Sequence, residues 1–291
     1  MFDLVIADAT LRGRPGTWHI GIDGARVAAL ETEPLTGRVT IEAGAGLVTE
    51  SFVNAHLHLD KVHTLDRIGD AALTAYTADG MAGAAASIDL ASSVKSGYDR
   101  GWIKPQARRV LLDGIRYGVR HVLAFADVDT AAGLEGVVPL LELREELRGV
   151  IDLQVGAFPQ DGLLRDPGAE ELVVEAVRLG VDAVGGIPWI EDGDSDQREH
   201  VRRMCGLAAA HGRRVAMLVD DSGDPALDTT AMLAEELLAH DLVGRGVANH
   251  ARALGRYDDD RLDGLVALAR RAGSASAAAR TRRLPTFPSN G

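Results

Sequence analysis

Five strand-like segments recur through the middle of the chain at a nearly constant interval. They begin at Val119, Val150, Asp182, Arg214 and Val247, about every 32 residues, and a helix-like segment precedes each one. A period of this length indicates one repeated structural unit, and alternating helices and strands favour a parallel sheet. The repeat therefore predicts an α/β fold. By itself it does not distinguish an open, doubly wound sheet from a barrel.

The element boundaries follow from apolar periodicity and from proline and glycine signals. Pro105 suits the start of a helix and Gly118 its end. Expected helices span residues 105–118, 134–147, 170–179, 199–210, 226–240 and 260–272, and expected strands span 119–125, 150–158, 182–186, 214–219 and 247–250. Residues 64–97, rich in alanine, glycine and threonine, are interpreted as a long loop with short helices.

The first 50 residues predict a small β domain. Leu4 and Ile6 alternate with small or polar neighbours, and residues 18–22 meet residues 27–30 across Asp23-Gly24, a strong hairpin signal. A further short strand is expected over residues 39–41. The alternative is that these strands form an edge of the main sheet.

A pair of histidines follows the apolar residues Phe52 and Val53. His56 and His58 are two positions apart, so both imidazoles project from the same side of an extended chain. Converging imidazoles suit a borderline metal such as zinc or iron. The alternative is an incidental pair, but its place at the end of an apolar strand, just before Asp60-Lys61, favours a metal site.

The stretch LVTESFVNAHLHLDK, residues 47–61, resembles the first barrel strand of the amidohydrolase superfamily, and within it the cytosine deaminase-like branch. The resemblance implies a (β/α)8 barrel beside a small β-sandwich. It implies a divalent metal, zinc or iron, that activates water against a C–N bond of a small cyclic amidine or amide. It also implies four ligands: His56 and His58 on the first strand, a histidine on the fifth and an aspartate on the eighth.

Two of those ligands are missing from the matching positions. Leu218 stands where the family has its third histidine, and residues 51–272 supply only six expected strands, so no eighth-strand aspartate is found. Residues 273–291 lack apolar periodicity and are interpreted as a disordered tail. We therefore expect an incomplete, C-terminally truncated barrel with weak metal binding and little turnover.

Four further residues match family positions with functional roles. Asp221 stands where a glutamate acts as general acid and base, although paired acids after a strand also cap helices. His250, in Asn-His-Ala-Arg-Ala-Leu, matches a histidine that contacts the attacking water or the substrate. Gln160 matches a glutamine that binds a pyrimidine amide edge, and Trp189 replaces a histidine, where it either stacks on a flat ring or packs in the core. The other histidines, such as His63, His200, His211 and His240, are interpreted as surface residues.

Composition narrows the class of partner. The net charge of −12 without a basic patch argues against nucleic-acid binding, and no apolar run is long enough for a membrane span. The single cysteine, Cys205, and the lack of a signal segment suit a cytoplasmic protein. We expect a small nitrogen heterocycle or amide as substrate, and exposed sheet edges that allow homo-oligomers. The alternative is an inactive truncated relative or a non-catalytic interaction protein.

Overall fold

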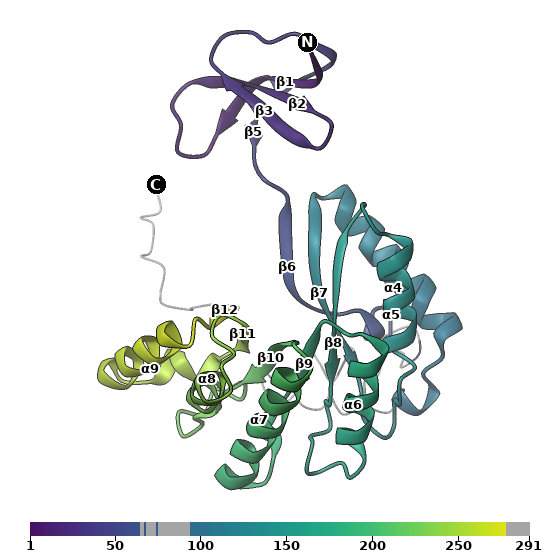
Figure 1. Cartoon of the computed structure of the whole chain (residues 1–291), viewed down its shortest axis with the longest axis vertical. Helices are drawn as coiled ribbons and strands as arrows, with labels where there is room; N and C mark the ends of the chain where they lie inside the picture. The colour runs from purple at the N-terminus through teal and green to yellow at the C-terminus, as the bar shows by residue number, and fades with distance from the viewer. Residues whose placement is uncertain (65–66, 68–73, 75–93, 278–291) are drawn as a thin grey trace. The chain divides into compact units, whose positions relative to one another are not determined.

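The computed structural model describes residues 1–64, 67, 74 and 94–277. The chain divides into two compact units, Met1–Phe52 and Val53–Gly291, and each is described by itself (Figure 1). The expected loop over 64–97 and the expected tail over 273–291 lie mostly outside the described residues.

The first unit is a five-stranded sheet. Strand β1 lies in the middle, antiparallel to β2 and parallel to β4 and β5. The alternation in β1 buries Val5, Ala7 and Ala9 on one face, and Gly24, with a φ of 57°, forms the predicted hairpin turn. The strands are β1 (Phe2–Leu11), β2 (Thr17–Asp23), β3 (Arg26–Glu31), β4 (Gly37–Glu42) and β5 (Leu47–Val48).

The second unit confirms the repeated βα pattern. Its strands follow one another in the order β12-β11-β10-β9-β8-β7-β6, and every register determined between neighbours is parallel. They are β6 (Phe52–His58), β7 (Val119–Asp127), β8 (Asp152–Phe158), β9 (Ala183–Gly186), β10 (Arg214–Val219), β11 (Gly246–His250) and β12 (Ala275–Ala277). The six predicted strands, β6 to β11, are thus all present and form most of a barrel.

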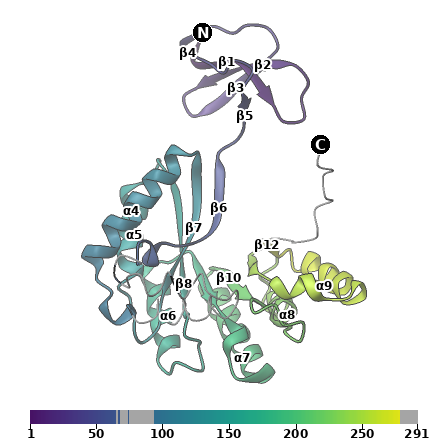
Figure 2. The ribbon, with the colours of Figure 1, turned by 180° about the vertical axis from the view of Figure 1, so that it is seen from behind.

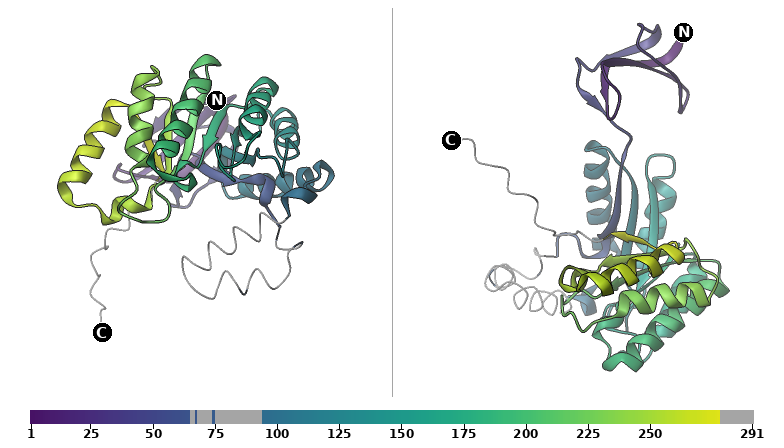
Figure 3. Two further views of the ribbon diagram at one scale, coloured as in Figure 1. Left: turned by 90° about the horizontal axis from the view of Figure 1, so that it is seen from below. Right: turned by 90° about the vertical axis from the view of Figure 1, so that its left-hand side faces the viewer.

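Helices cover the outer face of this sheet. They are α4 (Arg100–Arg116), α5 (Val137–Glu146), α6 (Ala169–Leu179), α7 (Gly193–Ala210), α8 (Thr229–Ala239) and α9 (Asp259–Arg271). Figures 1 and 2 show them flanking the strands from opposite sides, and the left view of Figure 3 shows them following one another in an arc from teal to yellow. None of the helices among the described residues is long and apolar enough to cross a membrane.

Three boundaries differ from the sequence prediction. Helix α4 begins at Arg100 rather than Pro105, because the Asp99 side chain accepts a hydrogen bond of 2.9 Å from the Gly101 amide and caps the helix. Helix α7 begins at Gly193 rather than residue 199, and its first turn carries acids that complement the helix dipole. Residues 275–277 correct the expectation of an unstructured tail from 273, since they pair with β11 as the short strand β12. Pairing to a neighbouring strand, rather than intrinsic propensity, makes these small residues a strand.

The core lies between the sheet and the helices. Val155 of β8, Val173 of α6 and Met204 of α7 are fully buried in one continuous apolar cluster. Each helix turns one apolar stripe toward the strands, so the carboxyl ends of the strands are held at one rim. Ligand sites of parallel barrels and sheets occur at that rim.

Candidate active site

The predicted histidines and Asp221 meet at the carboxyl rim of the sheet. His56 and His58 close β6, and His250 is the last residue of β11. Nε2 of His56 lies 3.2 Å from Nε2 of His250. Nδ1 of His250 lies 2.7 Å from Oδ2 of Asp221, a close contact whose angle is not that of an aligned hydrogen bond. Groups from the first, fifth and sixth strands therefore converge.

The backbone at this convergence is strained. Asp220, His250 and Ala251 have positive φ angles of 47°, 67° and 46°, a region that residues other than glycine rarely adopt. The Ala251 amide donates to the Val219 carbonyl at 2.9 Å, and the Ala253 amide donates to the Asp220 carbonyl at 3.1 Å. These bonds hold the two strand ends together, and strain of this kind concentrates at functional sites.

The acid pair after β10 divides into two roles. Asp220 accepts bonds from the amides of Thr229 and Thr230 at 2.7 and 3.1 Å, and from both of their hydroxyls, so it ties the strand end to the start of α8. Asp221 instead faces His250, and its Oδ1 lies 3.0 Å from Nε of Arg252. The helix-binding interpretation therefore describes Asp220, and Asp221 is the acid at the site.

The two β6 imidazoles are neutral at neutral pH. Burial, followed by the charge of His250, lowers the pKa of His56 to about 4. Burial, followed by the charge of Lys61, holds the pKa of His58 well below its usual value. Only a neutral imidazole binds a metal, so these values suit ligands. The Nδ1 atoms of both rings are buried without a hydrogen-bond partner.

Leu218 does not offer a ligand atom and instead completes an apolar floor. It is buried with Phe125, Phe158 and Ile187, and Trp189 packs against the same cluster. The Phe125 ring lies 5.0 Å from that of His56, and the Phe158 ring lies 5.3 Å from that of His58, between centroids. Trp189 thus takes part in packing, while its indole nitrogen is buried without a partner.

Gln160 is held by Lys61, whose ammonium donates to the Oε1 atom of Gln160. The same ammonium lies 2.9 Å from Oδ1 of Asp127 and 6.0 Å from the centre of the Phe158 ring. Gln160 therefore lies beside the aromatic floor, on the side of β8. No contact between Gln160 and His250 or Asp221 is found among the described residues.

A buried ionic cluster, which the sequence analysis did not identify, lies next to the histidines. Asp60 Oδ2 accepts a 2.9 Å bond from the Asp127 amide. The Lys95 ammonium lies 2.7 Å from Asp129, 2.7 Å from Asp161 and 3.4 Å from Asp127. Asp127 and Asp129 directly follow a predicted strand, which is a usable signal, whereas Lys95 lies in a stretch without periodicity.

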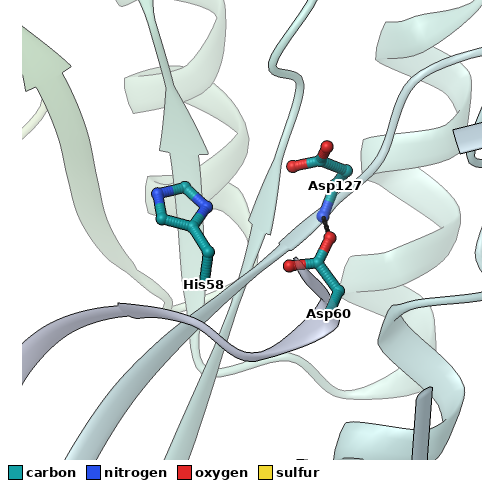
Figure 4. A group of neighbouring side chains, drawn as sticks. All are labelled: His58, Asp60 and Asp127. Carbon is teal, nitrogen blue, oxygen red and sulfur yellow. Dashed lines mark hydrogen bonds between the residues drawn. The ribbon is translucent and has the colours of Figure 1, made fainter. Parts of the chain in front are cut away.

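Part of this cluster resembles a metal site in its donor set. His58, Asp60 and Asp127 offer ligand atoms that all lie within 4.8 Å of one another (Figure 4). Burial, followed by the charge of Asp127, raises the pKa of Asp60 to about 7. Two ammonium groups already lie against Asp127, so the charge that a cation would balance there is largely balanced by the chain itself.

His200 corrects the interpretation of that histidine as a surface residue. It is fully buried, and its Nδ1 lies 2.7 Å from Oε1 of Glu191, which also accepts bonds from the amides of residues 163–165. His200 shares a helical stripe with the buried Val201, Met204 and Ala208, and that periodicity is a signal for burial. The pair fixes the loop after β8.

No profile of a known protein family matches the chain. Two curated relatives were found. An N-isopropylammelide isopropyl amidohydrolase of Pseudomonas sp. (strain ADP) is 29% identical over 99% of this chain and 70% of its own length. A pterin deaminase of Rhizobium rhizogenes is 25% identical over 78% of this chain and 50% of its own length.

Solved structures agree with this result. A 5-methylcytosine deaminase from Klebsiella pneumoniae is 26% identical, with a TM-score of 0.82 over 94% of this chain and 65% of that one. An atrazine chlorohydrolase from Arthrobacter aurescens, complexed with zinc, shares the fold at 16% identity and a TM-score of 0.59, over 94% of this chain and 71% of that one. The chain thus spans between half and about two thirds of the length of most of these proteins.

Proposed function

Since the chain is a relative of the amidohydrolase-superfamily deaminases, in the cytosine deaminase-like branch, we propose that it is a metal-dependent hydrolase of C–N bonds. Its substrate is a small nitrogen heterocycle with a cyclic amidine or amide. N-isopropylammelide, pterins and 5-methylcytosine, the compounds in the names of its relatives, are all flat nitrogen rings.

The observation that carries the proposal is the convergence of His56, His250 and Asp221. These residues lie on separate strands, yet the distances that join them are 3.2 and 2.7 Å. The sheet core does not require polar groups at this point, and the backbone is strained to place His250 there. Perturbed imidazoles in such a place mark a functional site.

A divalent metal fits the β6 end of this site. His56 and His58 are neutral, and their Nδ1 atoms lack partners, so each ring retains donor capacity. Zinc and iron both accept such nitrogen ligands. A metal held there would supply Lewis acidity and a water made nucleophilic near neutral pH.

The chain's own side chains then shape the substrate space. Phe125 and Phe158 form a flat apolar wall beside the histidines, which suits a planar ring. Gln160, held by Lys61, and Trp189, at the edge of the wall, are assigned to the edge and face of that ring. Asp221 and His250 are assigned to the chemistry at the reacting carbon.

A second candidate function is supported by Leu218. An apolar side chain at the third ligand position favours a non-catalytic relative that retains the fold. The two functions differ in a measurable way, because only the first requires an intact histidine pair for turnover.

The deciding experiment measures ammonia or amine release from cytosine, 5-methylcytosine, pterin and N-isopropylammelide. The purified chain is stripped with a chelator and reloaded with zinc or ferrous iron, beside a variant carrying His56→Ala and His58→Ala. We expect slow release, dependent on the metal and absent from the variant. Equal rates for the chain and the variant would reject the hydrolase and leave the non-catalytic relative.

A further inference from the structure

We propose that His250 is the third nitrogen ligand of the metal, in place of the imidazole that position 218 lacks, and that Asp221 orients it. The proposal rests on the proposed function for the presence of a metal. It assigns to this chain a ligand set drawn from β6 and β11 rather than from β6 and β10.

The first argument is the distance between donor atoms. Zinc binds histidine nitrogen at about 2.0–2.1 Å in tetrahedral sites, which places two such nitrogens about 3.3 Å apart. The Nε2 atoms of His56 and His250 are 3.2 Å apart. The His58 ring follows at 5.1 Å from that of His56, between centroids. Three imidazoles therefore surround one point.

The second argument is the partner of the other ring nitrogen. A histidine that binds a metal usually gives its second N–H to a carboxylate, which fixes the tautomer and the ring orientation. Nδ1 of His250 lies 2.7 Å from Asp221, and Arg252 lies 3.0 Å from the other oxygen of that carboxylate. Asp221 is thus positioned to act through His250.

The third argument is that the other places are taken. Leu218 has no donor atom and is packed in the apolar floor. In the group of His58, Asp60 and Asp127, the ammonium groups of Lys61 and Lys95 lie 2.9 and 3.4 Å from Asp127. A cation there would meet two like charges, whereas the listed contacts of His250 include no ammonium.

The test is a zinc titration of the chelator-stripped chain in competition with a chromogenic indicator, followed by a cobalt(II) spectrum. The variants are His250→Asn, because asparagine tolerates the left-handed backbone, Asp221→Asn, Asp127→Asn and, as a matched control, His240→Ala on helix α8. Circular dichroism verifies that each variant is folded. Asp221→Asn is read together with the cobalt spectrum, because a positioning residue alters the ligand field without removing a ligand.

We expect His250→Asn to weaken zinc binding at least 100-fold and to change the cobalt bands. Asp221→Asn should weaken binding 10- to 100-fold, and Asp127→Asn and His240→Ala should leave it unchanged. Zinc binding that survives His250→Asn but is lost in Asp127→Asn would overturn the ligand assignment and leave the metal-dependent function standing. A chain that binds no zinc or cobalt at all would overturn both.

Discussion

Two parts of the same rim treat their polar groups in opposite ways. Around β7 and β8, the carboxylates of Asp127, Asp129 and Asp161 are shared by the ammonium groups of Lys95 and Lys61. Around β10 and β11, His250 and Asp221 lie over an apolar floor that includes Leu218. The first part is closed on itself, and the second keeps donor atoms available.

The difference separates structural charges from functional ones. A buried ion cluster is stable only when each charge has partners, and such a cluster holds the loops that carry it. A group of neutral imidazoles with unpartnered nitrogens gains most from an added ligand. Acidic residues near a strand end are therefore a weaker sign of a metal site than imidazoles without partners.

The largest effect should come from opening the closed part. Lys95→Met leaves Asp129 and Asp127 buried with fewer partners and should lower the free energy of unfolding by about 3–5 kcal/mol. Urea denaturation followed by circular dichroism measures it. Lys104→Met, which removes exposed pairs with Glu142 and Glu146, is the matched control and should change little. Equal effects of the two substitutions would remove the distinction between the two parts.

A smaller effect should follow from adding a donor to the open part. Leu218→His places an imidazole in the apolar floor, so the stripped protein should lose about 1–3 kcal/mol of unfolding free energy. Zinc should restore that stability and bind about tenfold more tightly than it binds the parent chain, because one more nitrogen faces the same centre. Thermal melts with and without zinc measure both. A variant whose melting point ignores zinc would show that position 218 does not face the metal.

The smallest effect concerns pH, and the two parts should oppose each other. The folded state resists protonation of His56, so its contribution to unfolding free energy falls as pH drops from about 6.5 to about 4. The folded state holds a proton on Asp60 up to about pH 7, so its contribution falls as pH rises from about 4 to 7.

Single variants separate these two contributions. Relative to the parent chain, Asp60→Asn should gain stability as pH rises through that window, and His56→Gln should lose it. Urea denaturation at a series of pH values gives both slopes. Parallel slopes in the two variants would contradict the opposed contributions.

The sequence predicted most of the architecture because the repeat and the glycine and proline signals are local. It also named His56, His58, Asp221 and His250, which the fold brings together. It did not predict the burial of Lys95, since the partners of a buried lysine are distant in sequence and leave no local pattern. Strand β12 was missed for a related reason, because its residues become a strand only beside β11.

The contact between His56 and His250 joins residues that are 194 positions apart. A metal held by both would work as a clasp on the sheet, and its ligands would exist together only after the intervening strands had folded. Metal capture would then be one of the last events of folding, since loops of this length close late. The clasp would also transmit affinity into durability: zinc at 100 times its dissociation constant adds about 2.7 kcal/mol to the free energy of unfolding.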